Sequence, residues 1–284
     1  MRAIDITTNI IEQTVFEHFK YLPRLLGFDV RENERLNIVN CGLGSSMFNI
    51  VCNTHLEEWA KKAQDVECLE TGDFPVTKFP LTNFHMYGEN AVRKKVQEVI
   101  DFFEKQPFAW WIGPSCDPYW VRGVLKETFQ NHSTEHIMAC DLSKYNYTDK
   151  NDLEIQQVLS ITQLNDFISM LEPYDSSARA FFKEIKEWML KENEHLFVGY
   201  ENGVSVVISS LYIDRENSNA GIFNLITKED KRGLGFGTKM MQHLLKYAKD
   251  HYLNYASLIA SSDSGYRIYQ RLGFETLGQF ECFE

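Results

Sequence analysis

The segment RGLGFGT at residues 232–238 restricts the fold of this chain more than any other stretch of its sequence. It follows an apolar run at 220–227 that is predicted to be a strand, and it opens an amphipathic pattern that predicts a helix over 235–251. Glycines at such a junction let the backbone approach a ligand, and successive N–H groups then point into one concavity at the positive end of the helix dipole. A pyrophosphate suits such a site, and Arg232 adds a charge-assisted contact.

Two other interpretations of these glycines have to be weighed. Glycines at a loop-to-helix junction often serve only a tight turn. A dinucleotide-binding loop is the second alternative, but the spacing here is G-x-G-x-G rather than G-x-G-x-x-G. Only 47 residues follow Gly237, which is too few for the further β-α-β units of a doubly wound sheet. The sequence therefore disfavours a dinucleotide site.

A second motif, YRIYQRLGF, stands at residues 266–274, and its Tyr269 comes 37 residues after Arg232. Together the two motifs resemble the GCN5-related N-acetyltransferase (GNAT) superfamily. The pyrophosphate loop of that family has the form Q/R-x-x-G-x-G/A, and its last helix typically ends in Y-x-x-x-G-F. The matching positions in this sequence are Arg232, Gly235, Gly237, Tyr269, Gly273 and Phe274.

The resemblance implies an α/β fold with a mixed sheet that binds acetyl-CoA as cosubstrate and needs no metal. In the family, the strand before the loop hydrogen-bonds the pantetheine arm as a pseudo-strand, and the next strand, here 255–260, splays away to admit it. The loop holds the pyrophosphate, and residues just before the last helix often add contacts. The cofactor-binding residues implied in this way are Leu225, Ile226, Thr227, Arg232, Gly233, Leu234, Gly235, Phe236, Gly237, Thr238, Ser261 and Ser264.

The resemblance also implies that Tyr269 is the catalytic residue. In the family an amine attacks the thioester carbonyl directly in a ternary complex, and this tyrosine protonates the departing thiolate. A positioned general acid of this kind accelerates a reaction about 10²–10⁴-fold. The alternative role for Tyr269 is that of a packing residue in an amphipathic helix.

The general base is not identifiable from the sequence. Many family members carry an acidic residue on the strand that corresponds to 220–227, and this strand has none. An amine that is already neutral would need no base. The candidates for ordering a water that relays the proton are Asn224, Tyr212 and Ser209. Three acidic residues are interpreted as the solvated face of a helix, namely Glu184, Glu187 and Glu192.

The hydrophobic periodicity of the C-terminal half predicts the order β-α-α-β-β-β-α-β-α-β. Asn202-Gly203 between two apolar runs predicts a hairpin, because both turn residues tolerate positive φ. Apolar residues at i, i+3, i+4 and i+7 over 176–194 give the clearest helix pattern. The predicted elements span 154–159, 162–169, 176–194, 196–200, 204–214, 220–227, 235–251, 255–260, 264–272 and 274–283.

The N-terminal half is less legible. Its segment PFAWWIGP at 107–114 resembles the N-terminal halves of tandem GNAT proteins, in which one copy has lost the cofactor loop. With a polar stretch at 145–153 as the boundary, we predict two GNAT-like domains in tandem, a degenerate one at 1–148 and an acetyl-CoA-binding one at 149–284. The predicted helices of this half are 10–26, 89–103 and 118–129, and the strands are 47–52, 108–112 and 136–142.

Two further features of this half receive structural interpretations. The segment CGLGS at 41–45 precedes a strand rather than a helix, so we interpret it as a turn and not as a phosphate site. The aromatic pair Trp110-Trp111 is interpreted as part of a core rather than as a binding surface.

Composition narrows the class of protein. A chain of 284 residues with 44% hydrophobic residues is long enough for two domains. The net charge of −11 disfavours non-specific binding to nucleic acid or to anionic membranes. No signal-peptide pattern and no long apolar run occur, so we expect a cytoplasmic protein. The six cysteines form no C-x-x-C pair and are interpreted as thiols in a reducing compartment.

Three classes of function remain. The first is an N-acetyltransferase that acts on a primary amine, and Tyr269 beside a complete glycine loop favours it. The second is a catalytically silent acyl-CoA-binding or regulatory module, and the third is a protein whose N-terminal half docks a partner. The fold does not determine the acceptor, which can be a polyamine, an aminoglycoside, an amino acid, a peptide N-terminus or a lysine. The oligomeric state is also open, and a dimer is one possibility.

Overall fold

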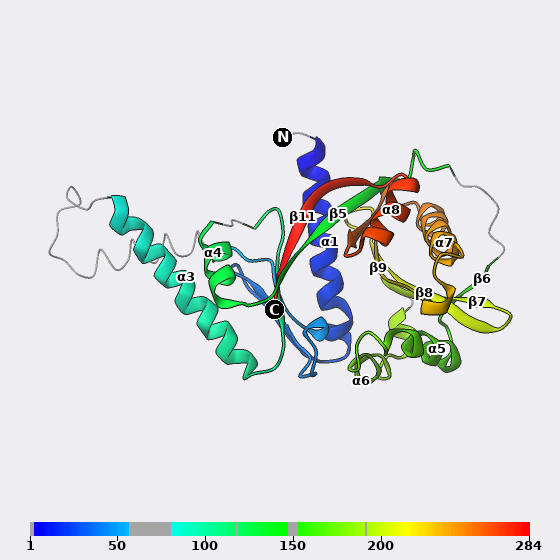
Figure 1. Ribbon diagram of the computed structural model, residues 1–284, viewed down its shortest axis with the longest axis horizontal. Helices are drawn as coiled ribbons and strands as arrows, with labels where there is room; N and C mark the ends of the chain where they lie inside the picture. The colour runs from blue at the N-terminus through cyan, green and yellow to red at the C-terminus, as the bar shows by residue number, and fades with distance from the viewer. Residues whose placement is uncertain (1–2, 57–80, 117–118, 147–152, 191) are drawn as a thin grey trace. The chain divides into compact units, whose positions relative to one another are not determined.

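The computed structural model of the chain describes residues 3–56, 81–116, 119–146, 153–190 and 192–284 (Figure 1). The chain divides into two compact units, and neither is continuous in sequence. The first unit comprises Met1–Phe28 and Glu135–Phe280, and the second comprises Asp29–Thr134 and Glu281–Glu284. This grouping differs from the predicted sequential split at residue 148.

Two segments of the N-terminal half account for the difference. Helix α1 (Ala3–Leu25) contacts strands β8 (Val204–Asp214) and β9 (Asn219–Thr227) of the first unit. Strand β5 (His132–Asp141) pairs antiparallel with β10 (Tyr255–Ala260). Both pairings are remote in sequence, so local patterns could not reveal them. The origin of residues 1–148 as a degenerate copy stays a prediction.

The sheet of the first unit has the strand order β11-β5-β10-β9-β8-β7-β6. Its remaining strands are β6 (Glu154–Gln157), β7 (Glu194–Glu201) and β11 (Glu275–Phe283). Strands β6 to β9 pair antiparallel with one another, and β9 pairs parallel with β10. The mixed α/β sheet and the order of elements along the C-terminal half are those predicted.

Helices cover both faces of this sheet. Helices α7 (Phe236–Asp250) and α8 (Asp263–Arg271) lie on one face, and α5 (Ile161–Leu171) and α6 (Ala178–Phe182) lie on the other (Figure 1). Alternate residues of β8 and β9 meet the apolar stripe of α7 in one buried core. That stripe consists of Met240, Met241, Leu244, Leu245 and Ala248, as the periodicity predicted.

Local chemistry fixes two of the predicted boundaries. Asn202 and Gly203 have φ values of 52° and 76°, which join β7 and β8 as a tight hairpin. Helix α5 begins at an N-cap serine, because the Ser160 hydroxyl accepts from the Gln163 N–H at 3.3 Å, and the Gln163 side chain reaches back to accept from the Leu159 N–H at 2.8 Å.

The prediction of one helix over 176–194 is wrong. Helix α6 ends at Phe182, a 3-10 turn follows at Glu187–Leu190, and Glu194 already lies in β7, buried opposite Tyr212. Short turns also bury apolar residues at helical spacing, so the pattern alone does not distinguish them from a continuous helix. Strand pairing begins at Asn193, whose side chain donates to the Ile213 carbonyl at 2.8 Å.

The second unit contains the strand order β1-β2-β3-β4 and residues Glu281–Phe283 of β11, which pair with β4. Its elements are β1 (Asp29–Glu32), β2 (Asn37–Asn40), β3 (Asn49–Cys52), β4 (Ala109–Ile112), α3 (Leu81–Phe103) and α4 (Tyr119–Thr128). Strands β1 and β2 were not predicted, since each has only four residues and β1 is mostly polar.

Two interpretations of the N-terminal half are confirmed. Trp110 is fully buried, and its indole N–H donates to the Thr54 hydroxyl at 2.9 Å, so it belongs to a core, whereas Trp111 is half-buried. Residues 41–45 form an irregular loop, with Gly42 at φ 65°, that leads into a 3-10 turn and β3. The predicted boundary residues 147–152 and Cys68 lie outside the described residues.

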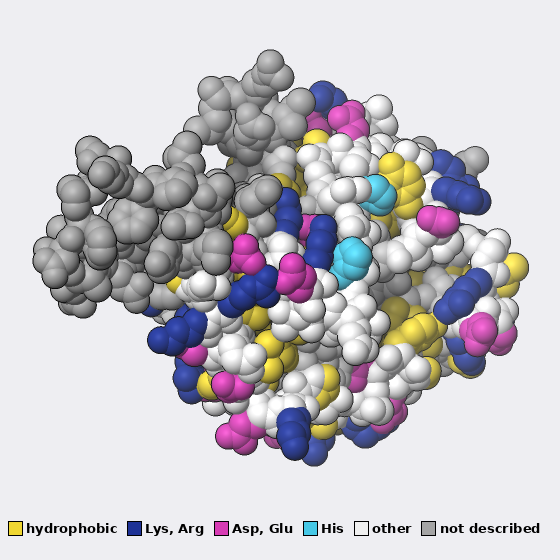
Figure 2. Space-filling view, turned by 60° about the vertical axis from the view of Figure 1, so that its left-hand side comes forward, with side chains coloured by type: hydrophobic (Ala, Val, Ile, Leu, Met, Phe, Trp, Pro, Cys, Tyr) yellow, Lys and Arg dark blue, Asp and Glu magenta, His cyan; other side chains and the backbone are white. Residues whose placement is uncertain are grey.

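The surface carries charges of both signs. Lys and Arg side chains are interspersed with Asp and Glu side chains on the face drawn in Figure 2. Over the described ranges, none of the helices is long and apolar enough to cross a membrane.

A buried polar network holds α1 on the sheet of the first unit. The Thr14 hydroxyl lies 2.7 Å from Asp214 Oδ2, to which it donates, and it accepts from Asn219 Nδ2 at 3.0 Å. The same Asn219 amide donates to the Ser257 hydroxyl on β10 at 2.8 Å. Thr14 therefore links the helix to the two strands that separate at the functional site.

Thr14→Val keeps the shape of the side chain and removes the hydroxyl. We expect a loss of about 1–3 kcal/mol in the free energy of unfolding, because the polar partners of Thr14 stay buried. Urea denaturation measures this loss. Thr128→Val is the matched control, since among the described residues the exposed Thr128 hydroxyl bonds only the Val124 carbonyl of its own helix, and it should stay within about 0.5 kcal/mol of wild type. Equal losses in both variants would contradict the proposed link.

Candidate functional site

The site is built where two parallel strands separate. The pairing of β9 with β10 runs from Asn219↔Tyr255 to Ile222↔Leu258 and then stops. Strand β10 continues with β5 as far as Ala260↔His136, whereas β9 continues with β8 as far as Val207↔Thr227. The edge of β9 that faces β10 past Ile222 therefore offers backbone N–H and C=O groups to an extended ligand.

A β-bulge turns β9 just beyond the point of separation. The register with β8 shifts between Ile208 and Ser210, and Asn224 has a φ of 53°. Side chains stabilise the bulge, because Asn224 Nδ2 donates to the Ser210 hydroxyl at 3.1 Å and the Ser209 hydroxyl donates to the Phe223 carbonyl at 2.8 Å. The bulge changes the direction of the strand that leads to the glycine loop.

The glycine loop brings the N-terminus of α7 against the end of β9. Gly233 and Gly235 have φ values of 79° and 89°, in the left-handed region that favours glycine. A Cβ on Gly237 would lie 3.3 Å from Thr227 Oγ1, so the backbones approach closely there. The first N–H groups of α7 have no acceptor within the helix, and together they form a site suited to an anion.

Arg232 is anchored at the mouth of this loop. Its Nε donates to the Thr227 carbonyl at 3.4 Å, and its Nη2 donates to the Tyr174 hydroxyl at 2.5 Å. Tyr174 lies between α5 and α6 and is 53% exposed. The guanidinium is thus held beside the helix N-terminus, where it adds positive charge.

Tyr269 projects from α8 into the same site. Its residue is only 9% exposed, and burial raises the pKa of its phenol to about 12. The phenol therefore keeps its proton at neutral pH and can donate it. A Cβ on Gly265 would lie 3.1 Å from the Tyr269 hydroxyl, so a glycine at 265 leaves room for the ring.

These features line one cavity of about 500 Å³. It brings together the β9 edge, the glycine loop and Tyr269. The sequence-predicted residues that line it are Leu225, Ile226, Thr227, Arg232, Gly233, Gly235, Phe236, Gly237, Thr238, Ser264 and Tyr269.

Two predicted residues do not line the cavity. Leu234 is 59% exposed, and Ser261 is exposed just before Ser262, which lines the cavity instead. Ser262 caps α8 by accepting from the Gly265 N–H at 3.2 Å, and a search for N-cap serines would have found it. The other lining residues that sequence reasoning missed are Tyr174, Lys231, Gly265, Ile268 and Arg271.

The three candidates for ordering a water near the reaction centre have other roles. Ser209 and Asn224 stabilise the bulge, and Tyr212 is buried against His18 and Tyr21 of α1. None of the three lines the cavity. Glu184 and Glu192 are exposed, as the sequence analysis expected.

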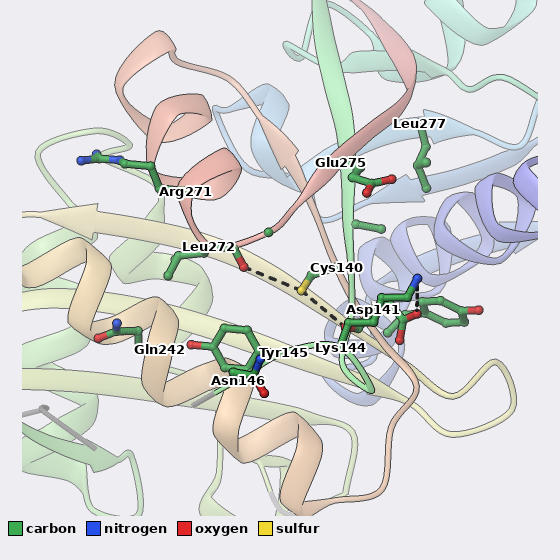
Figure 3. A pocket seen from close by; sticks show the side chains of 13 residues that line it. Cys140, Asp141, Lys144, Tyr145, Asn146, Gln242, Arg271, Leu272, Glu275 and Leu277 are labelled. Atoms are coloured by element: carbon green, nitrogen blue, oxygen red, sulfur yellow. Dashed lines mark hydrogen bonds and ion pairs between the residues drawn. The ribbon is translucent and has the colours of Figure 1, made fainter. Parts of the chain in front are cut away.

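A second cavity of about 600 Å³ lies at the C-terminal end of α8 (Figure 3). Cys140 lies inside it, with its Sγ 3.9 Å from the carbonyls of Asp141 and Leu272. Burial raises the pKa of the Cys140 thiol to about 11, which leaves it un-ionised and a poor nucleophile. In the part of the chain that the structure describes, no three His, Cys, Asp or Glu residues are grouped to hold a metal ion.

The left-handed backbone at Gly235 can be tested by the free energy of unfolding that is lost when a side chain is added there. Gly235→Ala meets no atom within 4 Å of the new Cβ, so its effect isolates the backbone conformation. We expect a loss of about 1–2 kcal/mol in the free energy of unfolding. Gly44→Ala is the control, because Gly44 also has open space but no positive φ. Thermal unfolding measures both losses. If Gly235→Ala were no less stable than Gly44→Ala, the left-handed conformation at Gly235 would be refuted.

Comparison with known proteins adds to this geometry. Residues 162–274 match the model of the acetyltransferase (GNAT) family. No curated protein sequence matches the chain. A GCN5-related N-acetyltransferase from Kribbella flavida shares 12% identity with a TM-score of 0.65, over 96% of this chain and 95% of that one.

Two further solved structures are similar over nearly the whole chain. A GCN5-related N-acetyltransferase-like protein from Streptococcus suis 89/1591 has 12% identity and a TM-score of 0.54, covering 98% of this chain and 99% of its own. A conserved protein of unknown function from Staphylococcus epidermidis ATCC 12228 has 15% identity and a TM-score of 0.58, with 90% and 93% covered. These likenesses concern the fold, and the family match concerns the sequence. The chain therefore carries a domain of the acetyltransferase (GNAT) family at residues 162–274.

Proposed function

We propose that this protein is an N-acetyltransferase that moves the acetyl group of acetyl-CoA to a primary amine. The observation that carries the proposal is the single cavity in which a free strand edge, a glycine-rich helix N-terminus and a buried phenol meet. Each of the three suits a different part of the substrate. The family match supports acetyl transfer in general.

The residues present fit an acyl-CoA thioester. The unpaired edge of β9 at Leu225, Ile226 and Thr227 suits the amide groups of a pantetheine arm. The N–H groups of 233–238 suit a pyrophosphate, since the helix dipole and Arg232 both favour negative charge there. Gly237 leaves space that a Cβ would fill beside Thr227.

Tyr269 supplies the acid in this proposal. The amine forms its bond to the thioester carbonyl carbon, and the C–S bond breaks with its electron pair on sulfur. A phenol whose pKa is raised to about 12 stays protonated until charge develops on sulfur. Donation then stabilises the transition state more than the ground state, which is what accelerates the reaction.

Thermal unfolding tests cofactor binding. Acetyl-CoA should raise the melting temperature, because a ligand that binds only the folded chain stabilises it by mass action. NADH should cause no shift. Gly237→Val should abolish the shift with acetyl-CoA, because the branched side chain would occupy the space between α7 and Thr227. Equal shifts with both nucleotides would exclude the proposed ligand.

Steady-state kinetics of Tyr269→Phe tests the mechanism, once release of CoA in a screen of amines has identified an acceptor. The substitution removes the hydroxyl and keeps the ring, so we expect kcat to fall about 10²–10³-fold while KM for acetyl-CoA stays near its original value. A packing role predicts little change in either constant. A role in holding the cofactor predicts a raised KM with an unchanged kcat. Acetyl-CoA binding without turnover of any amine would favour the silent acyl-CoA-binding module.

A further inference from the structure

A half-buried histidine and a buried glutamate lie together on the face of the sheet that α1 covers. His18 comes from α1 and Glu194 from the first position of β7, and His18 Nε2 lies 3.7 Å from Glu194 Oε2. Their side chains are 16% and 2% exposed. Neither residue is part of the glycine loop or the cavity described above. The pair is therefore a separate ionisable cluster within the first unit.

Each member of the pair has a buried polar atom without a partner. His18 Nδ1 and Glu194 Oε2 have no hydrogen-bond partner among the described residues. Such atoms are uncommon in native proteins, because each costs the free energy of its lost hydration. Their position calls for a functional explanation, and a polar ligand that hydrogen-bonds His18 Nδ1 provides one.

His18 lies at the point where the sheet opens. The last pair between β9 and β10 is Ile222↔Leu258, and the His18 ring stacks on the next residue, Phe223, with ring centroids 3.6 Å apart. A Cβ on Gly221 would lie 2.7 Å from the Phe223 ring and 3.2 Å from Thr14 Cγ2, so this ring faces α1.

Tyr269 approaches the opening from the other side. It belongs to the core that β8 and β9 share with α7, on the face opposite to α1. For a thioester held between the strands, with its cofactor on the α7 and α8 side, the face left for an attacking amine is the one that α1 covers. His18 lies beside that route.

The electrostatic surroundings of the pair suit a cation. Burial lowers the pKa of His18 to about 3 and raises the pKa of Glu194 well above its usual range, so both groups resist charge in the unliganded protein. Glu194 lies close to the phenols of Tyr21 on α1 and Tyr212 on β8, and the carboxylates of Glu17, Glu192 and Asp214 lie near the same two phenols. Lys20 is paired with Glu17 at 2.6 Å. The acidic neighbours favour an incoming ammonium group.

We propose that His18 and Glu194 form the acceptor-side base of the transferase: they bind the ammonium group of the amine substrate and remove its proton. This inference rests on the proposed acetyl transfer and identifies the base that the sequence did not reveal. The ammonium charge stabilises the Glu194 carboxylate. Once charged, the carboxylate draws in the His18 Nε2–H, which lies 3.7 Å away in the unliganded protein, and the resulting hydrogen bond makes the Nδ1 lone pair more basic. Nδ1 is then the proton acceptor, directly or through one water.

The protons balance in this scheme. An alkylammonium gives its first proton to His18 Nδ1, which later releases it to solvent. The neutral amine then adds to the thioester carbonyl carbon, and the C–S bond breaks as the tetrahedral intermediate collapses. Tyr269 gives a proton to sulfur and regains one from solvent, while the nitrogen gives its second proton to His18 Nδ1, which releases it in turn. The products are an amide, a thiol and one proton in solution.

The dependence of kcat/KM on pH tests the pair. Wild type should use the ammonium form, so kcat/KM for the amine should change little between pH 7 and pH 9. His18→Gln and Glu194→Gln should lose about 10³-fold in kcat/KM at pH 7, because a positioned base contributes about 10²–10⁴-fold. Their kcat/KM should then rise about tenfold per pH unit and approach wild type near pH 10, where an alkylamine loses its proton in solution. KM for acetyl-CoA should not change.

Matched controls separate this role from a structural one. Glu184→Gln removes an exposed carboxylate, and His251→Gln removes a histidine at the end of α7; both should keep the wild-type pH profile. A loss in His18→Gln that is the same at every pH, or a wild-type rate at pH 7, overturns the proposal.

A second measurement needs neither turnover nor folded variants of the pair. The protein is labelled with ¹⁵N-histidine, which gives ring signals from its eight histidines. Replacing each of the seven histidines other than His18, one at a time, assigns their signals and leaves the remaining signal as that of His18. With CoA present, butylammonium chloride should shift the His18 ring resonances, and 1-butanol should not. An unmoved His18 signal overturns the pair even in an active enzyme. A moved signal in a protein that acetylates no amine leaves the binding site standing and overturns the proposed function instead.

Discussion

The end of the β9–β10 ladder at Ile222↔Leu258 is the constraint on which the site depends. Strand β10 has partners on both edges, and its pairing with β5 extends two residues further than its pairing with β9. Strand β9 is turned by the bulge at Asn224 and follows β8 instead. The opening thus results from two competing sets of strand hydrogen bonds. The N-terminal half of the chain supplies one of them, because β5 precedes the family match at residues 162–274.

Helix α1 is a second contribution of the N-terminal half to the opening, on the other face of the sheet. Through Thr14 it binds Asp214 on β8 and Asn219 on β9, and Asn219 in turn binds Ser257 on β10. One buried network therefore spans the three strands around the opening. The same helix brings His18 to Phe223, one turn further along. A fragment without residues 1–148 lacks both α1 and β5, which pack on β8 and β9 and pair with β10, respectively.

Local signals in the sequence predicted the parts of the fold that rest on local chemistry. The Asn202-Gly203 turn, the stripe of α7 and the glycine loop depend on backbone conformation and periodicity within a few residues. The prediction of one helix over 176–194 was wrong because successive short turns bury apolar residues that have the same spacing as in a helix. The grouping into units, and the contributions of Tyr174 and His18, depend on contacts between residues far apart in sequence. No pattern in a single chain encodes those contacts directly.

The effect of the His18–Glu194 pair on the free energy of unfolding argues that the pair does not serve to stabilise the fold. In the unfolded chain a glutamate ionises near pH 4.3, so its raised pKa in the folded protein costs free energy at neutral pH. The lowered pKa of His18 costs free energy only as the pH falls below about 6.5, where the unfolded chain binds the proton first. An apolar pair of similar size would avoid both costs and leave no polar atom without a partner. Thr14, four residues earlier, shows that α1 can be fastened to the sheet by a hydrogen-bonded, uncharged side chain. The cost in stability at position 18 and its partner is what we expect of groups that serve chemistry at the opening, as proposed above, rather than the cohesion of the helix with the sheet.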